Sequence, residues 1–250
     1  HHCSSVAVVA TGQDCHPCIV TGGTMAAPLA FEQPSIDKAW QAFLQHIPVF
    51  VVIYLGTVVF TMLGFAIYFG IVLIAAGASG GNSDAALSLA TALGQIAQFP
   101  FSLITSLLSV LIVAVPALFY ERGEVVTIEA AWQLVIGRFW RYLLAGVFFS
   151  VVMTIGFVLC ILPGIAVALV TPVYVNRIFV TEMSIGEAFS QSFQVVYRSE
   201  NGLSFVGLEV LTGIIVGFAT LLTCGLGGFV FVPMASFYLQ NVAYNRGLLR

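Results

Sequence analysis

The stretch Pro48–Gly77 reads PVFVVIYLGTVVFTMLGFAIYFGIVLIAAG and contains no charged residue. About 20 consecutive apolar residues are enough to cross the hydrocarbon core of a bilayer as an α-helix. This stretch is therefore long enough to span a membrane, and the turn-forming residues ASGGNSD that follow it end the first predicted span. The whole chain has the same character, because 60% of its residues are hydrophobic and 8% are charged, against about 25% charged in an average soluble domain.

Five further apolar segments follow, and together they predict an all-α polytopic membrane protein with about six transmembrane helices. The second segment, Ala85–Tyr120, is uncharged but contains Pro100 and Pro116. At 1.5 Å per residue it is roughly 50 Å long, which exceeds a hydrocarbon core of about 30 Å, so we expect it to be kinked or to project outward. The remaining spans are predicted at residues 142–162, 163–181, 203–223 and from about 228.

The positive residues predict how these spans are oriented. All eight Lys and Arg residues can be placed on one face of a six-span arrangement, while the connections on the other face contain none. Positive residues are retained on the cytoplasmic side during insertion. We therefore expect a multi-pass protein of the cell (inner) membrane with both termini in the cytoplasm. The eight residues are Lys38, Arg122, Arg138, Arg141, Arg177, Arg198, Arg246 and Arg250.

Three segments of the chain begin alike: SIDKAWQAFLQHI from Ser35, TIEAAWQLVIGRF from Thr127 and SIGEAFSQSFQVV from Ser184. The hydroxyl residue is a natural helix N-cap, and Ser184 with Glu187 forms the pattern of a capping box. Apolar residues recur at helical spacing in each copy, which predicts an amphipathic helix at the membrane–water interface before each pair of spans. The alternative is that each segment is the cytoplasmic extension of a span.

This repetition predicts the domain organisation. Residues 1–34 are expected to be a disordered or non-native leader and N-terminal tail, since Met25 opens a more ordinary start. Residues 35–250 form a single six-span membrane domain of three parallel repeats, each an interfacial helix plus a helical hairpin. The repeat units are about 35–122, 127–183 and 184–250. Parallel repeats are rarer than inverted ones in secondary transporters, which lowers the weight of a transport function.

Several short motifs resemble those of a known group of proteins. They are Leu162-Pro163-Gly164-Ile165, then Pro172-Val173, then Ser184-Ile185-Gly186-Glu187-Ala188 with Ser192 one turn on. From about Trp132 to the C-terminus, the chain resembles the YciC-like and glycerophosphodiester phosphodiesterase membrane-domain group of bacterial integral membrane proteins. The resemblance implies a six-span helical domain with no well-defined activity of its own. The separate soluble catalytic domain of the phosphodiesterase members has no counterpart here, so no catalytic residues are carried over.

A few polar residues lie inside the predicted spans. Glu209 is the only acid well inside one, and an intramembrane carboxylate is by default a functional hypothesis. Asn176 and Arg177 on the fourth span, and Gln240 and Asn241 on the sixth, lie at a similar depth. We therefore predict a polar cluster that would bind a proton or solute. The alternatives are a Glu209–Arg177 ion pair and a side chain that snorkels to the interface.

The sequence also bears on association and on catalysis. Gly213 and Gly217 form a small-xxx-small pair, which would serve either packing inside the bundle or dimerisation. The pair Cys15 and Cys18 has the spacing of two metal ligands, but a lone CxxC is a weak signal, and we expect neither a metal site nor a cofactor. No Ser/His/Asp set, phosphate-binding loop, paired carboxylates or basic cluster occurs, so neither an enzyme nor a nucleic-acid-binding protein is expected.

The chain is therefore expected to be a non-catalytic integral membrane protein that supports membrane or envelope organisation, or that is accessory to a partner complex. Its expected partners are the lipid bilayer and a membrane protein partner or a second copy of the chain. The alternative is a small-solute permease or channel that uses the polar cluster around Glu209.

Overall fold

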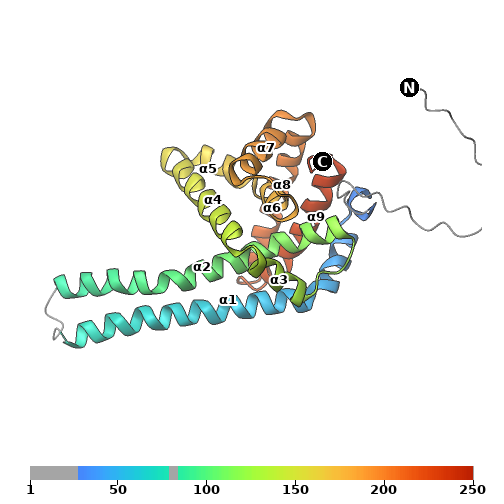
Figure 1. The fold of residues 1–250 in the computed structure, drawn as a ribbon. Coiled ribbons are helices and arrows are strands. Elements are labelled where there is room, and N and C mark those ends of the chain that lie inside the picture. The colour runs from blue at the N-terminus through green and yellow to red at the C-terminus, as the bar shows by residue number, and fades with distance from the viewer. Residues whose placement is uncertain (1–27, 79–83, 250) are drawn as a thin grey trace, which may run out of the picture.

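A computed structural model describes residues 28–78 and 84–249, and every regular element in these ranges is a helix (Figure 1). The predicted all-α fold class is thereby confirmed. Cys15, Cys18, Arg250 and most of the expected leader lie outside the described residues. The elements are the 3-10 helix η1 (Pro28–Phe31) and the α-helices α1 (Ile36–Ala78), α2 (Asp84–Arg122), α3 (Ile128–Gly137), α4 (Phe139–Leu159), α5 (Ile161–Ala168), α6 (Thr171–Val180), α7 (Ile185–Arg198), α8 (Glu200–Leu222) and α9 (Gly228–Asn245).

Four of the described helices are long and apolar enough to cross a membrane: α1, α2, α4 and α8. The pair α5 and α6 would supply a fifth crossing as one broken span, since the two helices meet at a bend of 41°. The sixth predicted span forms α9, which is not among these candidates because Gln240, Asn241 and Asn245 lower the hydropathy of its second half. The chain is thus a helical membrane protein with several spans, and the count of six goes beyond what hydropathy supports.

Helices α1 and α2 form a long antiparallel hairpin that extends past the other helices, which gather beside one end of it (Figure 1). Both helices are longer than a bilayer core requires, as the length of the second segment predicted. The two backbones approach closely at Gly94, where an added Cβ would lie 2.9 Å from a ring carbon of Tyr68. A glycine at this position therefore permits the close packing of the hairpin.

The three predicted helix starts are confirmed. The side chains of Ser35, Thr127 and Ser184 each accept a hydrogen bond from a backbone N–H three residues on, at 3.2, 3.2 and 3.3 Å. The capping box at Ser184 is formed in one direction only among the described hydrogen bonds. The Glu187 carboxylate instead accepts from the Gln191 side chain at 3.1 Å.

The three repeated segments have different structures. The first is continuous with its span, since α1 runs through Pro48 without a break, and it matches the alternative of a span extension. The second is the separate helix α3, which ends at the non-helical backbone of Arg138. The third is the separate helix α7, and Ser199 caps the start of the span that follows.

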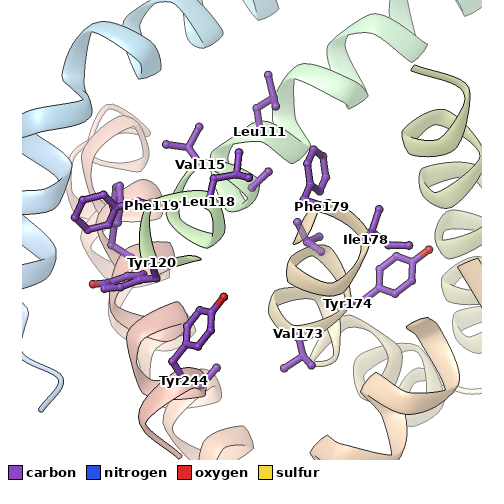
Figure 2. Close-up of a cluster of buried hydrophobic side chains, with 14 of the residues drawn as sticks. Leu111, Val115, Leu118, Phe119, Tyr120, Val173, Tyr174, Ile178, Phe179 and Tyr244 are labelled. Carbon is purple, nitrogen blue, oxygen red and sulfur yellow. The ribbon is translucent and has the colours of Figure 1, made fainter. Parts of the chain in front are cut away.

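The core of the protein lies where α2, α6 and α9 meet (Figure 2). Leu111 and Leu118 of α2 lie across from Phe179 of α6, and all three side chains are buried. Aromatic rings from α2 and α9 close this core, with Tyr120 and Tyr244 6.4 Å apart between ring centroids. Polar side chains in this region are therefore removed from both water and lipid.

Candidate functional site

A chain of buried hydrogen bonds joins α6 to α9 and α2. The Asn176 side-chain amide donates to Gln240 Oε1 and to the Tyr244 hydroxyl, both at 3.1 Å. Gln240 Nε2 donates to the Pro172 carbonyl at 2.8 Å, and the Tyr244 hydroxyl donates to Glu121 Oε2 at 3.0 Å. Asn176 and Gln240 are 3% and 0% exposed. Two of the predicted site residues thus meet, and their polar groups bond to other protein groups.

Asn241 connects α9 to the residues before α1. Its side-chain amide donates to the Ala30 carbonyl at 2.9 Å and to the Glu32 carbonyl at 3.3 Å. Ala30 is fully buried within η1. This short part of the predicted leader and tail, residues 28–34, therefore includes a helical turn that packs on the bundle, and Asn241 holds it there.

Arg177 lies between α7 and the residues that follow α9. One of its terminal nitrogens donates to Gln191 Oε1 at 2.5 Å, and the other donates to the Leu248 carbonyl at 3.4 Å. Among the described residues, no ion pair joins Arg177 to Glu209. The guanidinium group is instead held by an uncharged amide and a backbone carbonyl, and its Nε is buried without a hydrogen bond.

Glu209 is separate from these four residues. Its Oε2 atom is buried, and none of the described residues forms a hydrogen bond with it. The carboxylate interacts electrostatically with Tyr197 of α7, whose hydroxyl donates to the Ala166 carbonyl at 2.7 Å. Burial raises the pKa of Tyr197, and the Glu209 charge raises it further. The predicted cluster is therefore divided into a bonded network on α6 and α9 and a single carboxylate on α8.

Hydrogen bonds also join the helix ends that carry the basic residues. Arg141, at the start of α4, donates to the carbonyls of Thr181 and Met183 after α6, at 2.7 and 2.8 Å. Asn201, at the start of α8, donates to the Arg246 carbonyl at the end of α9, at 3.1 Å. These contacts join the start of α4 to the end of α6, and the start of α8 to the end of α9.

Sequence reasoning missed the role of His46, which is fully buried in α1. Its Nδ1 lies 2.7 Å from the Ala42 carbonyl, and its Nε2 lies 3.0 Å from the Val126 amide nitrogen. The Val126 N–H donates to Nε2, so Nδ1 carries the ring proton and donates to Ala42. The imidazole therefore fastens the α2–α3 connection to α1. A lone histidine within a helical apolar stripe was the available signal for this contact.

The chain matches no known protein family, no curated protein and no solved structure. The resemblance to the YciC-like group therefore depends on its short motifs alone, and a role for each residue has to come from the geometry.

Proposed function

We propose that this chain is a non-catalytic integral membrane protein that supports membrane or envelope organisation by associating with a membrane protein partner or with a second copy of itself. The observation that carries the proposal is the bonded state of its polar interior. Asn176, Gln240 and Asn241 each bond to other protein groups. A solute site would need such groups to face an open space.

The surface of α8 supports association as the means of action. Gly213 and Gly217 lie one turn apart, and a Cβ added at either glycine would contact nothing within 4 Å. The small-xxx-small pair therefore does not pack inside the bundle, which was one of the two uses that the sequence allowed. In membranes, small residues at this spacing let two helices approach closely, and such an approach is available here to a helix from another chain.

Association is tested with the double substitution Gly213→Leu and Gly217→Leu. We expect the bulky side chains to abolish the assembly that wild-type protein forms in its own membrane, measured by cross-linking before solubilisation. Gly207→Leu is the matched control, because this glycine is also open and lies in the same helix. An unchanged cross-linked assembly in the double variant would contradict this use of α8.

We further propose the finer topology: six crossings in three parallel repeats, with both termini in the cytoplasm. The three tryptophans of the chain support it, because Trp40, Trp132 and Trp140 are 41%, 58% and 72% exposed and all lie near basic helix ends. Tryptophan is enriched at the membrane–water interface. The α4–α5 and α8–α9 turns would then face away from the cytoplasm.

Two exposed free cysteines, Cys160 and Cys224, occupy these two turns and provide the test. A membrane-impermeant maleimide should label both in intact cells, with peptide mapping to assign the label. The variant Asn245→Cys, at the end of α9, should be labelled only after permeabilisation. Labelling of Cys160 and Cys224 that also requires permeabilisation would refute the orientation.

A small-solute permease or channel is the second candidate, and the unpartnered carboxylate of Glu209 favours it. Ionisable groups inside spans mark many proton and solute pathways. Flux into vesicles containing purified protein, abolished in Glu209→Gln but retained in the exposed Glu200→Gln, would establish this function. Equal flux in the wild type and in Glu209→Gln would show that the Glu209 carboxylate takes no part in transport.

A further inference from the structure

A groove of about 500 Å³ runs between α2 and α4. The two helices are in contact and diverge along their length (Figure 1). The walls of the groove are mostly apolar, and they include Leu103 on α2 and Leu143 and Val147 on α4. Gly146 widens it, since an added Cβ would contact nothing within 4 Å. The groove thus offers a long apolar slot to a molecule within the bilayer.

A buried polar group without a partner lies at the basic end of this groove. Tyr142 lines the groove and is 4% exposed, and its hydroxyl forms no hydrogen bond among the described residues. The neighbouring Arg141 has a buried Nε that also lacks a hydrogen bond. Burying a polar group without a partner is costly, so the Tyr142 hydroxyl in the groove wall points to an acceptor supplied by a bound molecule.

The charge around Tyr142 is predominantly positive. Arg122, Arg138 and Arg141 all interact electrostatically with its hydroxyl, and Glu182 is the one acid that does so. Arg138 forms a 2.5 Å ion pair with Glu182. Arg122 is exposed and forms no ion pair within the described ranges. The end of the groove therefore favours an anion.

Three hydroxyl groups continue the groove away from this basic end. Ser106 lies on α2, and Ser150 and Thr154 lie one turn apart on α4. None of the three side chains forms a hydrogen bond within the described part of the chain, whereas Thr105 and Ser109 of α2 bond to backbone carbonyls at 2.9 Å. These groups add hydrogen-bonding atoms to the otherwise apolar walls of the groove.

We propose that this groove binds one anionic phospholipid, with its phosphate near Arg122 and the Tyr142 hydroxyl and an acyl chain between α2 and α4. The volume favours a lipid over a transmembrane helix of a partner. A helix about 10 Å across would fill roughly twice 500 Å³ over only half the bilayer, whereas small-ligand sites occupy about 300–1,000 Å³. The site does not depend on the association proposed for α8.

The experiment uses purified full-length protein in phosphatidylcholine vesicles that contain a trace of a photoactivatable phospholipid with a diazirine in its acyl chain. One probe has a phosphatidylglycerol headgroup and the other has a phosphatidylcholine headgroup. Peptide mapping should place the phosphatidylglycerol probe on residues 103–110 and 143–154, several-fold above the phosphatidylcholine probe. Equal labelling of these residues by the two probes would overturn the proposal.

Two variants separate the headgroup contact from the groove. Arg122→Gln should lower the preference for phosphatidylglycerol about fivefold, the effect of one basic residue near an anionic surface. The exposed Arg198→Gln, outside the groove, should leave it unchanged. Gly146→Leu should abolish labelling of the groove by either probe, whereas Gly70→Leu on α1, an equally open position, should not.

Unchanged labelling in Arg122→Gln and in Gly146→Leu would also overturn the proposal. Absence of labelling of the wild-type groove by both probes would overturn it too, and is the result expected if a helix of a second copy fills the groove. Circular dichroism and size-exclusion chromatography of each variant establish that a loss of labelling does not reflect misfolding. The α8 assembly should be intact in Gly146→Leu, so the two proposals can fail separately.

Discussion

Replacement of Asn176 by alanine tests whether the polar interior is structural. The Asn176 side chain is 3% exposed and donates two hydrogen bonds, to Gln240 and to Tyr244, both at 3.1 Å. Asn176→Ala removes both and leaves Gln240 Oε1 buried without a donor. Hydrogen bonds between membrane helices average about 0.6 kcal/mol, and an orphaned buried acceptor costs about 1–3 kcal/mol. We therefore expect a loss of about 2 kcal/mol in the free energy of unfolding.

The assay is equilibrium unfolding of the purified protein in detergent micelles by titration with sodium dodecyl sulfate. Thermal unfolding should show the same order, with a midpoint lowered by roughly 4–8 °C for about 2 kcal/mol. Asn245→Ala is the matched control. Asn245 lies on α9 and donates to the Phe31 carbonyl at 3.1 Å, but it is exposed, so its loss should change the free energy by less than about 0.5 kcal/mol.

The direction of the result decides between the two functions. Residues that bind a solute are often retained at a cost in stability, so replacing them frequently leaves a protein as stable or more stable. If Asn176→Ala unfolds at the same detergent concentration as the wild type, or at a higher one, the network is not structural. Asn176 and Gln240 would then be candidates for a polar site of their own, separate from Glu209.

Three further predictions concern single positions, all measured in the same unfolding assay. Glu209→Gln should stabilise the protein by about 1 kcal/mol, because an amide costs less to bury than an unpartnered carboxylate. A loss of stability would instead show that the carboxylate has a stabilising partner. Gly202→Ala should destabilise the protein by about 1–3 kcal/mol, since the added Cβ would lie 2.2 Å from a backbone carbonyl oxygen. Gly207→Ala, at an open position of the same helix, should be neutral or stabilising. Equal effects of the two substitutions would refute the packing argument. His46→Leu should cost about 1–3 kcal/mol because it keeps the bulk but leaves the Val126 N–H without its acceptor, and an unchanged stability would mean that this contact is dispensable.

The features that the sequence predicted well depend on local interactions. Ser35, Thr127 and Ser184 cap their helices because a cap involves residues only three positions apart. Spans such as Pro48–Gly77 are recognisable because the apolar run itself satisfies the bilayer. The sixth span stays a prediction, because α9 joins an apolar first half to a second half in which the Gln240 amide bonds to Asn176 of α6.

The site was only half predictable, since its contacts join residues far apart in the chain. The position of each residue along its predicted span indicated that Asn176 and Gln240 lie at a similar depth in the membrane. It gave no information about which face of α6 is turned toward α9. It also placed Glu209 at the same level, although that carboxylate lies beside Tyr197 of α7. The bond from Tyr244 to Glu121 spans 123 positions and has no periodic signal in the sequence.

The distribution of satisfied and unsatisfied polar groups gives the two proposals a common physical basis. In the core, Asn176 and Gln240 bond to protein, and the low dielectric surroundings make any rearrangement of them costly. The unbonded hydroxyl of Tyr142 is instead buried at the end of a groove between two spans, next in sequence to the unbonded Nε of Arg141. A protein that bonds Asn176 and Gln240 internally and carries its unbonded tyrosine hydroxyl at a groove between spans is suited to act through what it contacts in the bilayer. Lipid at the α2–α4 groove and a neighbouring helix at α8 are the contacts that its chemistry favours.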